Sequence, residues 1–197
     1  MAKYLRFETS NEVTDVLFAV IDGNSNVKSI MKVLKQPQST VSSKLQFLRD
    51  NDIILKDKWK FESNWKTITK VFQEEVKKYF ENLLDFLKDV SKFKKNEIKT
   101  IKDIIERIPE IFDEKRVVSI YEMYADYFID GCVKRISTSE LAELYFDMLK
   151  KTDTIKFKGF DEDIVSIKRL FNKLNISDME EDFFIQVEKN IEGEVNG

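Results

Sequence analysis

Apolar residues recur at spacings of three and four along most of the chain, which predicts a mainly helical protein. The first helix is expected to begin at a cap on Ser10 or Asn11 and to end at Gly23. A second helix is expected with Ile30, Met31, Val33 and Leu34 on its apolar side, and a short strand over residues 4–7. The chain contains only 5 Gly and 2 Pro in 197 residues, which leaves few breaks between the helices.

The segment that follows Pro37 has the most informative pattern. Val41, Leu45 and Leu48 are spaced by four and three residues, so they share one face of a helix. Ser39 is expected to cap this helix, because its hydroxyl can accept from the free amides of the first turn. The other face carries small or hydrogen-bonding side chains, namely Ser39, Thr40, Ser43, Lys44 and Gln46. A helix that is apolar inside and lightly polar outside fits the major groove of DNA.

A short hairpin is expected after this helix. Residues 50–52 (Asp-Asn-Asp) end the helix, since Asn and Asp tolerate a left-handed backbone. Residues 53–55 and 59–61 then predict two strands around a short cationic tip at residues 56–58. Trp59 and Phe61 alternate along the second strand, so both are expected to pack on the helices and not on bases.

The ordered run of helix, turn, helix and hairpin over residues 27–55 resembles winged-helix transcription regulators of the ArsR and MarR type. The resemblance is carried by a Gln-Ser-Thr-Val-Ser motif and two spaced leucines: Gln38, Ser39, Thr40, Val41, Ser42, Leu45 and Leu48. Asp52 stands where the family commonly has Gly. The likeness covers the first third of the chain, and implies a winged helix-turn-helix DNA-binding domain over residues 1–66.

The longest periodic segment comes next. Its apolar seam alternates spacings of four and three: Phe72, Val76, Tyr79, Leu83, Phe86, Val90 and Phe93. A second apolar stripe lies beside it: Phe80, Leu84 and Leu87. Two stripes indicate contacts on two sides, so residues 67–93 are expected to form a linking helix that also dimerises. The alternative is a central helix buried in a monomeric bundle.

Further periodic segments predict an all-helical domain over residues 67–197. One helix is expected to end near Pro109, and the next near Gly131. Ser137 and Glu140 have the spacing of a capping box that opens another helix. The predicted fold class is therefore mainly α: an N-terminal winged helix-turn-helix domain with a short β-wing, followed by a helical C-terminal domain.

Charge is distributed unevenly along the chain. Residues 1–66 contain 11 Lys or Arg and 8 Asp or Glu, and the rest of the 33 basic and 36 acidic residues follow them, so the two parts carry +3 and −6. A basic front fits a protein that presents one end to phosphates, although ordinary variation is the alternative. No signal peptide or membrane span is expected, and the single Cys132 suits a reducing cytoplasm.

Catalytic chemistry has little support in the sequence. The chain has no His and no glycine-rich phosphate loop, which removes the commonest general base and most zinc sites. The acidic clusters at 161–163 and 180–182 are expected to be solvated helix starts. No enzyme activity, catalytic residue, metal or cofactor is therefore expected. A group of aromatic residues fits either a helix core or a pocket for an unknown effector: Tyr121, Tyr124, Tyr127 and Phe128.

These observations predict a sequence-specific transcriptional regulator that binds double-stranded DNA as a homodimer in the cytoplasm. The Lys-, Ile-, Asn- and Phe-rich composition hints at a prokaryotic or archaeal source. The expected DNA contacts are Lys28, Gln38, Ser39, Thr40, Ser43, Lys44, Gln46, Lys56 and Lys58. The predicted face lacks Arg and Asn, so specificity is expected to depend on DNA shape, Gln46 or dimer spacing. The alternative is a winged-helix docking or scaffold module with an exposed apolar patch around Phe47.

Overall fold

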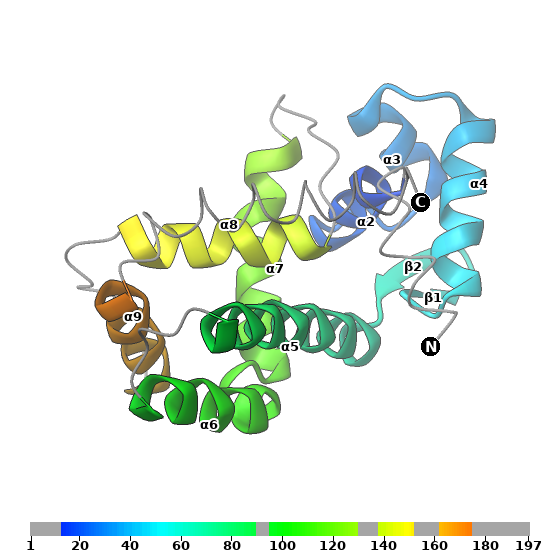
Figure 1. The fold of residues 1–197 in the computed structure, drawn as a ribbon. Helices are drawn as coiled ribbons and strands as arrows, with labels where there is room; N and C mark the ends of the chain where they lie inside the picture. The colour runs from blue at the N-terminus through cyan, green and yellow to red at the C-terminus, as the bar shows by residue number, and fades with distance from the viewer. Residues whose placement is uncertain (1–12, 90–94, 130–137, 152–161, 175–197) are drawn as a thin grey trace, which may run out of the picture. The chain divides into compact units, whose positions relative to one another are not determined.

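The computed structural model describes residues 13–89, 95–129, 138–151 and 162–174. These residues form eight helices and one two-stranded antiparallel sheet (Figure 1). The helices are α2 (Thr14–Ile21), α3 (Val27–Leu34), α4 (Gln38–Asp50), α5 (Trp65–Asp89), α6 (Lys95–Ile111), α7 (Glu114–Ile129), α8 (Thr138–Lys151) and α9 (Glu162–Leu174). The strands are β1 (Ile54–Asp57) and β2 (Lys60–Ser63). The prediction of a mainly helical protein with a small sheet is confirmed.

Some predicted features lie outside the described residues. They are the strand over residues 4–7, the caps at Ser10, Asn11 and Ser137, residue Cys132 and the acidic cluster at 180–182. Among the helices that are described, none is both long enough and apolar enough to cross a membrane.

The chain divides into two compact units, and the divisions fall inside α5, α6 and α8. The first unit comprises Met1–Lys77 and Ile108–Tyr145, and the second comprises Lys78–Arg107 and Phe146–Gly197. The helix α7 packs along α2, so both belong to the first unit. This unit therefore contains residues from both sides of the domain boundary that was expected after residue 66. That boundary stays a prediction.

Local sequence explains how α3 and α4 begin. Asn26 caps α3: its side chain accepts from the Ser29 amide at 2.9 Å, and the Ser29 hydroxyl accepts from the Asn26 amide at 3.4 Å. The N-cap of α4 is Pro37, which has an extended backbone and no side chain able to accept. The expectation that Ser39 caps α4 is therefore wrong, because Ser39 already lies inside the first turn.

The hairpin forms directly after α4. Asp52 has a φ of 57°, which confirms a left-handed residue where the helix ends. The strands pair in the register Ile54↔Ser63 to Asp57↔Lys60, which leaves Lys58 and Trp59 as a two-residue turn. The Phe61 amide donates to the Ser25 carbonyl at 2.7 Å, which ties β2 to the loop between α2 and α3. The predicted hairpin is confirmed, with its second strand beginning one residue later than expected.

An aromatic core fills the first unit. The Tyr121 ring lies 6.0 Å from Phe18, 6.0 Å from Trp65 and 6.1 Å from Phe72, measured between ring centroids. Phe112 continues this core, 5.7 Å from Phe72. Tyr121 is buried, which agrees with a place in the core.

The helix α6 ends close to Pro109, as the sequence predicts. This helix continues past Pro109 to Ile111, because a proline in the last turn removes only one backbone hydrogen bond. Side chains bond to two backbone carbonyls that follow Pro109. Gln73 Nε2 donates to the Phe112 oxygen at 2.7 Å, and Arg116 Nη1 donates to the Ile111 oxygen at 2.8 Å.

The second unit is organised around four aromatic side chains. Tyr79 and Phe80 of α5 meet Phe146 of α8 and Phe171 of α9. All six pairs of rings are in contact, with centroid distances from 4.8 Å for Tyr79–Phe146 to 6.3 Å for Tyr79–Phe171. Close-packed rings of this kind contribute both buried area and favourable edge-to-face geometry.

Candidate nucleic-acid interface

The amphipathic character predicted for α4 is present. Val41, Leu45 and Leu48 are buried. The opposite side of the helix exposes a row of neutral polar side chains: Gln38, Ser39, Thr40, Ser42, Ser43 and Gln46. These residues lie at spacings of three and four, so a surface that approaches one of them meets the next ones as well.

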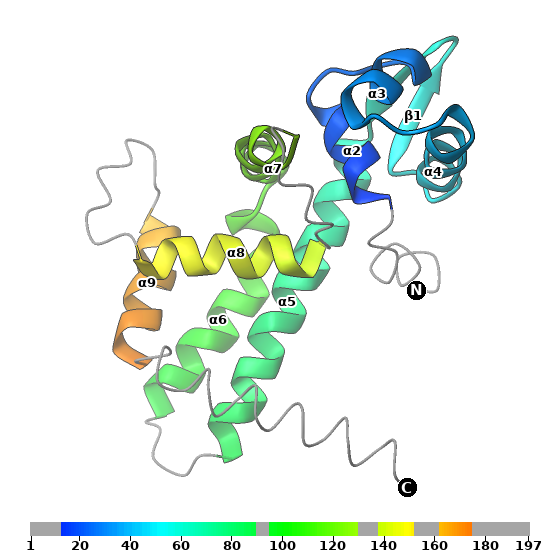
Figure 2. The same ribbon diagram turned by 90° about the horizontal axis from the view of Figure 1, so that it is seen from above.

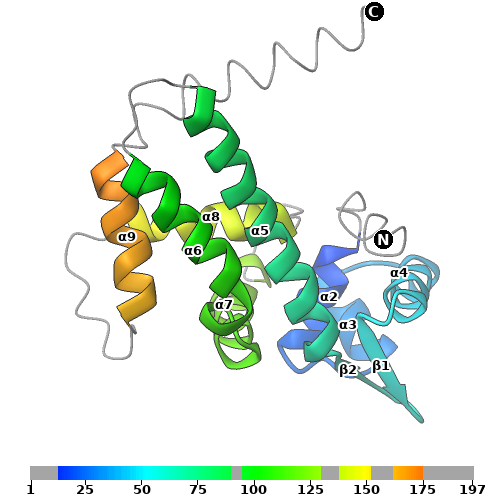
Figure 3. The ribbon, with the colours of Figure 1, turned by 60° about the horizontal axis from the view of Figure 1, so that its bottom comes forward.

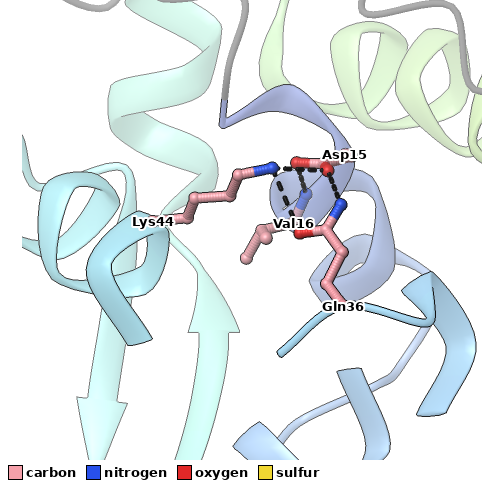
Figure 4. A network of polar contacts seen from close by, with 4 residues as sticks. All are labelled: Asp15, Val16, Gln36 and Lys44. Carbon is pink, nitrogen blue, oxygen red and sulfur yellow. Dashed lines mark hydrogen bonds and ion pairs between the residues drawn. The ribbon is translucent and has the colours of Figure 1, made fainter. Parts of the chain in front are cut away.

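Lys44 does not lie on this exposed side. Its Nζ is 2.7 Å from Asp15 Oδ2, and the two side chains are only 12% and 4% exposed (Figure 4). Lys44 Nζ also donates to Gln36 Oε1 at 3.2 Å, and Gln36 Nε2 donates to Asp15 Oδ2 at 2.6 Å. The second carboxylate oxygen accepts from the Val16 amide at 2.7 Å. The prediction that Lys44 contacts DNA is therefore revised, because its ammonium is held inside the protein.

This Asp15–Gln36–Lys44 network joins three elements. Asp15 lies in the first turn of α2, Gln36 lies between α3 and α4, and Lys44 lies in α4 (Figure 4). Each side chain bonds to the other two, so the charge of each ion is neutralised and its polar atoms are used. The signal in the sequence was Asp15, a charged residue directly before the apolar residues 16–21 of α2. The spacing of apolar residues gives no information about such a charged residue.

A second chain of polar contacts runs along the surface of α4. Arg49 Nη2 donates to Gln46 Oε1 at 2.6 Å, and Gln46 Nε2 donates to Asp50 Oδ1 at 2.7 Å. All three side chains belong to exposed or half-buried residues. Arg49 is not among the predicted contacts, although its spacing of three from Gln46 places it beside the predicted face. A guanidinium here supplies the donor fork that the face was thought to lack.

The hairpin presents the remaining predicted cations. Lys56 and Lys58 are exposed, and Lys56 Nζ lies 5.8 Å from the centroid of the Phe61 ring. Phe61 is 8% exposed, which confirms that it packs on the protein. Trp59 is 84% exposed, so the expectation that it also packs inward is wrong. The reason is that Trp59 lies in the turn and not on the strand.

Exposed charge over residues 13–66 is positive. The exposed basic residues are Lys28, Lys32, Lys35, Arg49, Lys56, Lys58, Lys60 and Lys66. The exposed acidic residues are Asp22, Asp50, Asp52, Asp57 and Glu62. Eight basic and five acidic residues give the exposed surface a net charge of +3. Lys44 and Asp15 do not change this sum, because their opposite charges form an ion pair. Lys28 is on the first turn of α3 and exposed.

The predicted dimerisation seam is partly used inside one chain. Phe72 and Val76 are 0% exposed, so they belong to the protein's own core and not to a face open to a partner. Tyr79 stacks on Phe146. Leu83 and Phe86 are half-buried and keep part of their surface exposed. The second stripe is buried (Phe80, Leu84 and Leu87), while Val90 and Phe93 lie outside the described residues.

Within the described parts of the chain, no group of three His, Cys, Asp or Glu side chains is arranged to hold a metal ion. Comparison with protein-family models, with curated proteins and with solved structures gives no match to this chain.

Proposed function

We propose that this protein is a winged-helix transcriptional regulator that binds double-stranded DNA. The observation that carries the proposal is the exposed neutral polar face of α4, followed in the chain by a hairpin that carries three exposed lysines, Lys56, Lys58 and Lys60. A helix with such a face enters a major groove, and a cationic hairpin beside it contacts the backbone.

In this arrangement, α4 presents Ser39, Thr40, Ser43 and Gln46 to base edges, and Gln38 lies at the end of the helix that meets phosphate. Lys28, Lys56 and Lys58 neutralise phosphates. The network around Asp15 has a positioning role, because it fixes α4 against α2 and against the turn that leads into α4.

A homodimer is the proposed assembly, because two copies double the number of phosphates that are neutralised and allow a two-fold symmetric site. The half-buried Leu83 and Phe86 are the described residues of the α5 seam that support it. A cytoplasmic location is proposed with it, in agreement with the single Cys of the chain.

The test is selection from a pool of random duplex DNA, followed by affinity measurements across a salt series. A variant with Lys56→Gln and Lys58→Gln is expected to bind more weakly, with a salt slope reduced by up to about 0.9 for each phosphate that the variant no longer neutralises. The matched control is Lys99→Gln with Lys102→Gln, which removes two exposed lysines from α6. An equal decrease in affinity for both variants, or no binding at low salt, would contradict the proposal.

One observation favours a second candidate, a protein-docking module. Leu55 is 51% exposed on the same hairpin as Trp59, so apolar surface is present there, whereas Phe47 is half-buried. Docking of a protein through this surface predicts binding that changes little with salt, whereas DNA binding weakens steeply as salt rises.

A further inference from the structure

The Asp15–Gln36–Lys44 network lies where α2, α4 and the turn before α4 meet. The helices α2, α3 and α4 lie side by side in the first unit (Figures 2 and 3). The Lys44 and Asp15 side chains are so little exposed that their charges are almost fully removed from water. Apolar side chains of similar volume often replace such a pair without loss of stability, because the cost of desolvation offsets the attraction. Stability alone therefore does not explain why charged residues occupy these positions.

The apolar contacts of α4 do not determine its orientation by themselves. Hydrophobic burial is non-directional, and an apolar core loses a unique packing before it loses stability. Hydrogen bonds, in contrast, have preferred distances and angles. Lys44 Nζ bonds to Asp15 Oδ2 on α2 at 2.7 Å and to Gln36 Oε1 in the turn at 3.2 Å. Rotation or sliding of α4 against α2 would break these bonds.

Gln36 fixes the place where α4 begins. It lies between Lys35, which has a left-handed backbone with φ of 52°, and Pro37, which has a φ of −62°. Both ends of its amide are used, since Nε2 donates to Asp15 Oδ2 at 2.6 Å and Oε1 accepts from Lys44. One carboxylate oxygen of α2 thus holds both the turn and the helix that follows it.

We propose that Asp15, Gln36 and Lys44 are positioning residues that determine how well the protein discriminates between DNA sequences. This inference rests on the proposed DNA binding. Thr40 and Ser43 precede Lys44 by four residues and one residue, so they move with it. Contacts to base edges require placement to within about 0.5 Å, whereas phosphate contacts carry no sequence information. A loosened α4 is therefore expected to lose discrimination and to keep its affinity for unrelated sequences.

The first test removes the charges of the network as a pair. Asp15→Asn with Lys44→Met leaves no unpaired buried charge, so the free energy of unfolding by urea is expected to stay close to that of the parent. The ratio of the affinities for a selected duplex and a scrambled duplex is expected to fall about ten-fold, the effect of one mismatched base pair. The affinity for the scrambled duplex is expected to stay the same.

The matched control removes another ion pair between two helices. Arg107 Nη2 of α6 lies 2.8 Å from Asp163 Oδ1 of α9, in the second unit. Arg107→Met with Asp163→Asn makes the corresponding change of charge and is expected to leave the affinity ratio unchanged.

A rescue experiment separates positioning from stabilisation. Asp15→Asn alone leaves Lys44 without its carboxylate, and Gln36→Glu alone places a second carboxylate beside Asp15. Each single change is expected to lower the affinity ratio. The two changes together keep one carboxylate, one amide and the ammonium, with the carboxylate moved from α2 to the turn, and are expected to restore the ratio.

The two proposals fail in different ways. A parent-like affinity ratio for the neutral Asp15→Asn, Lys44→Met variant at parent-like stability would overturn the positioning role and leave the DNA-binding proposal standing. If that variant does not fold, the exchange of carboxylate and amide decides, because recovery of stability without recovery of the ratio would also overturn the role. Absence of duplex binding by the parent protein would overturn both proposals.

Discussion

Lys44 Nζ lies 2.7 Å from Asp15 Oδ2, although the two residues are 29 positions apart in the chain. The pair joins α4 to α2, and Gln36 completes it from the turn before α4. A lysine on a helix proposed to bind DNA thus contributes to the fold and not to the bound surface.

Replacement of this lysine is expected to destabilise the protein. Lys44→Met leaves the Asp15 carboxylate buried without its cation, and the expected decrease in the free energy of unfolding by urea is about 3–5 kcal/mol. Lys32→Met, at an exposed position of α3, is the control and is expected to change little. The double variant Asp15→Leu with Lys44→Met is expected to recover most of the stability. Equal stability of Lys44→Met and the parent would show that the pair contributes nothing.

Substitution of Lys58 in the hairpin turn is expected to change stability and DNA binding in opposite directions. Lys58→Gly removes the cost of a left-handed backbone for a residue with a Cβ, about 1–2 kcal/mol, offset by the greater entropy of Gly in the unfolded chain. The melting temperature is therefore expected to rise slightly while duplex affinity falls. Lys60→Gly, one step into β2, is expected to lower both. A lower melting temperature for Lys58→Gly would contradict the assigned turn.

The Gln73 side chain is expected to stabilise the protein locally, at the end of α6. Gln73→Ala removes the donor to the Phe112 carbonyl, and the expected destabilisation is about 1–2 kcal/mol. Glu74→Ala changes the neighbouring exposed position and is expected to have an effect below about 0.5 kcal/mol. Thermal unfolding followed by circular dichroism compares the two. Indistinguishable melting curves would show that water replaces the amide without cost.

Removal of one ring from the aromatic cluster of the second unit is expected to destabilise the protein strongly. Phe146→Ala removes a fully buried ring that packs against Tyr79, Phe80 and Phe171, and the expected cost is about 3–5 kcal/mol. Leu144→Ala, two residues earlier and 39% exposed, is expected to cost less than half of that. Denaturant unfolding measures both values. A comparable cost for the two variants would mean that this cluster is not a core.

The proposed dimer is tested on α5. Leu83→Ser with Phe86→Ser is expected to convert a dimer to a monomer in sedimentation equilibrium and to weaken binding to a two-fold symmetric duplex. Glu81→Ser with Asn82→Ser changes two exposed neighbours and is expected to leave the mass unchanged. A monomeric parent protein would remove the assembly from the proposed function.

Periodicity along the chain predicted α4, the hairpin and the start of α5. The reason is that the spacing of apolar residues indicates which of them are buried in a helix or a strand. It did not predict where Lys44 points. Lys44 lies three residues after Val41 and four before Leu48, at the margin of the buried face. The direction of its long side chain is decided by a carboxylate on α2, and a pattern within one helix contains no information about that residue.

Trp59 illustrates a different limit. The predicted strand began one residue earlier than β2 does, and this single step moves Trp59 from a packed position to the turn. Hairpin register depends on the turn geometry and on the bond from Phe61 to Ser25, which joins segments 36 residues apart. Neither of them can be predicted from the alternation of apolar and polar residues in the hairpin.

The exposed side of α4 carries a further consequence. Ser39, Thr40 and Ser43 are small and exposed, while Val41, Leu45, Leu48 and the Asp15 network keep the helix in place from the other side. In the proposed mode of DNA binding, folding and recognition thus use different positions of one helix. The exposed positions could then be exchanged while the scaffold is kept, which would make α4 a suitable site on which to select new target specificities.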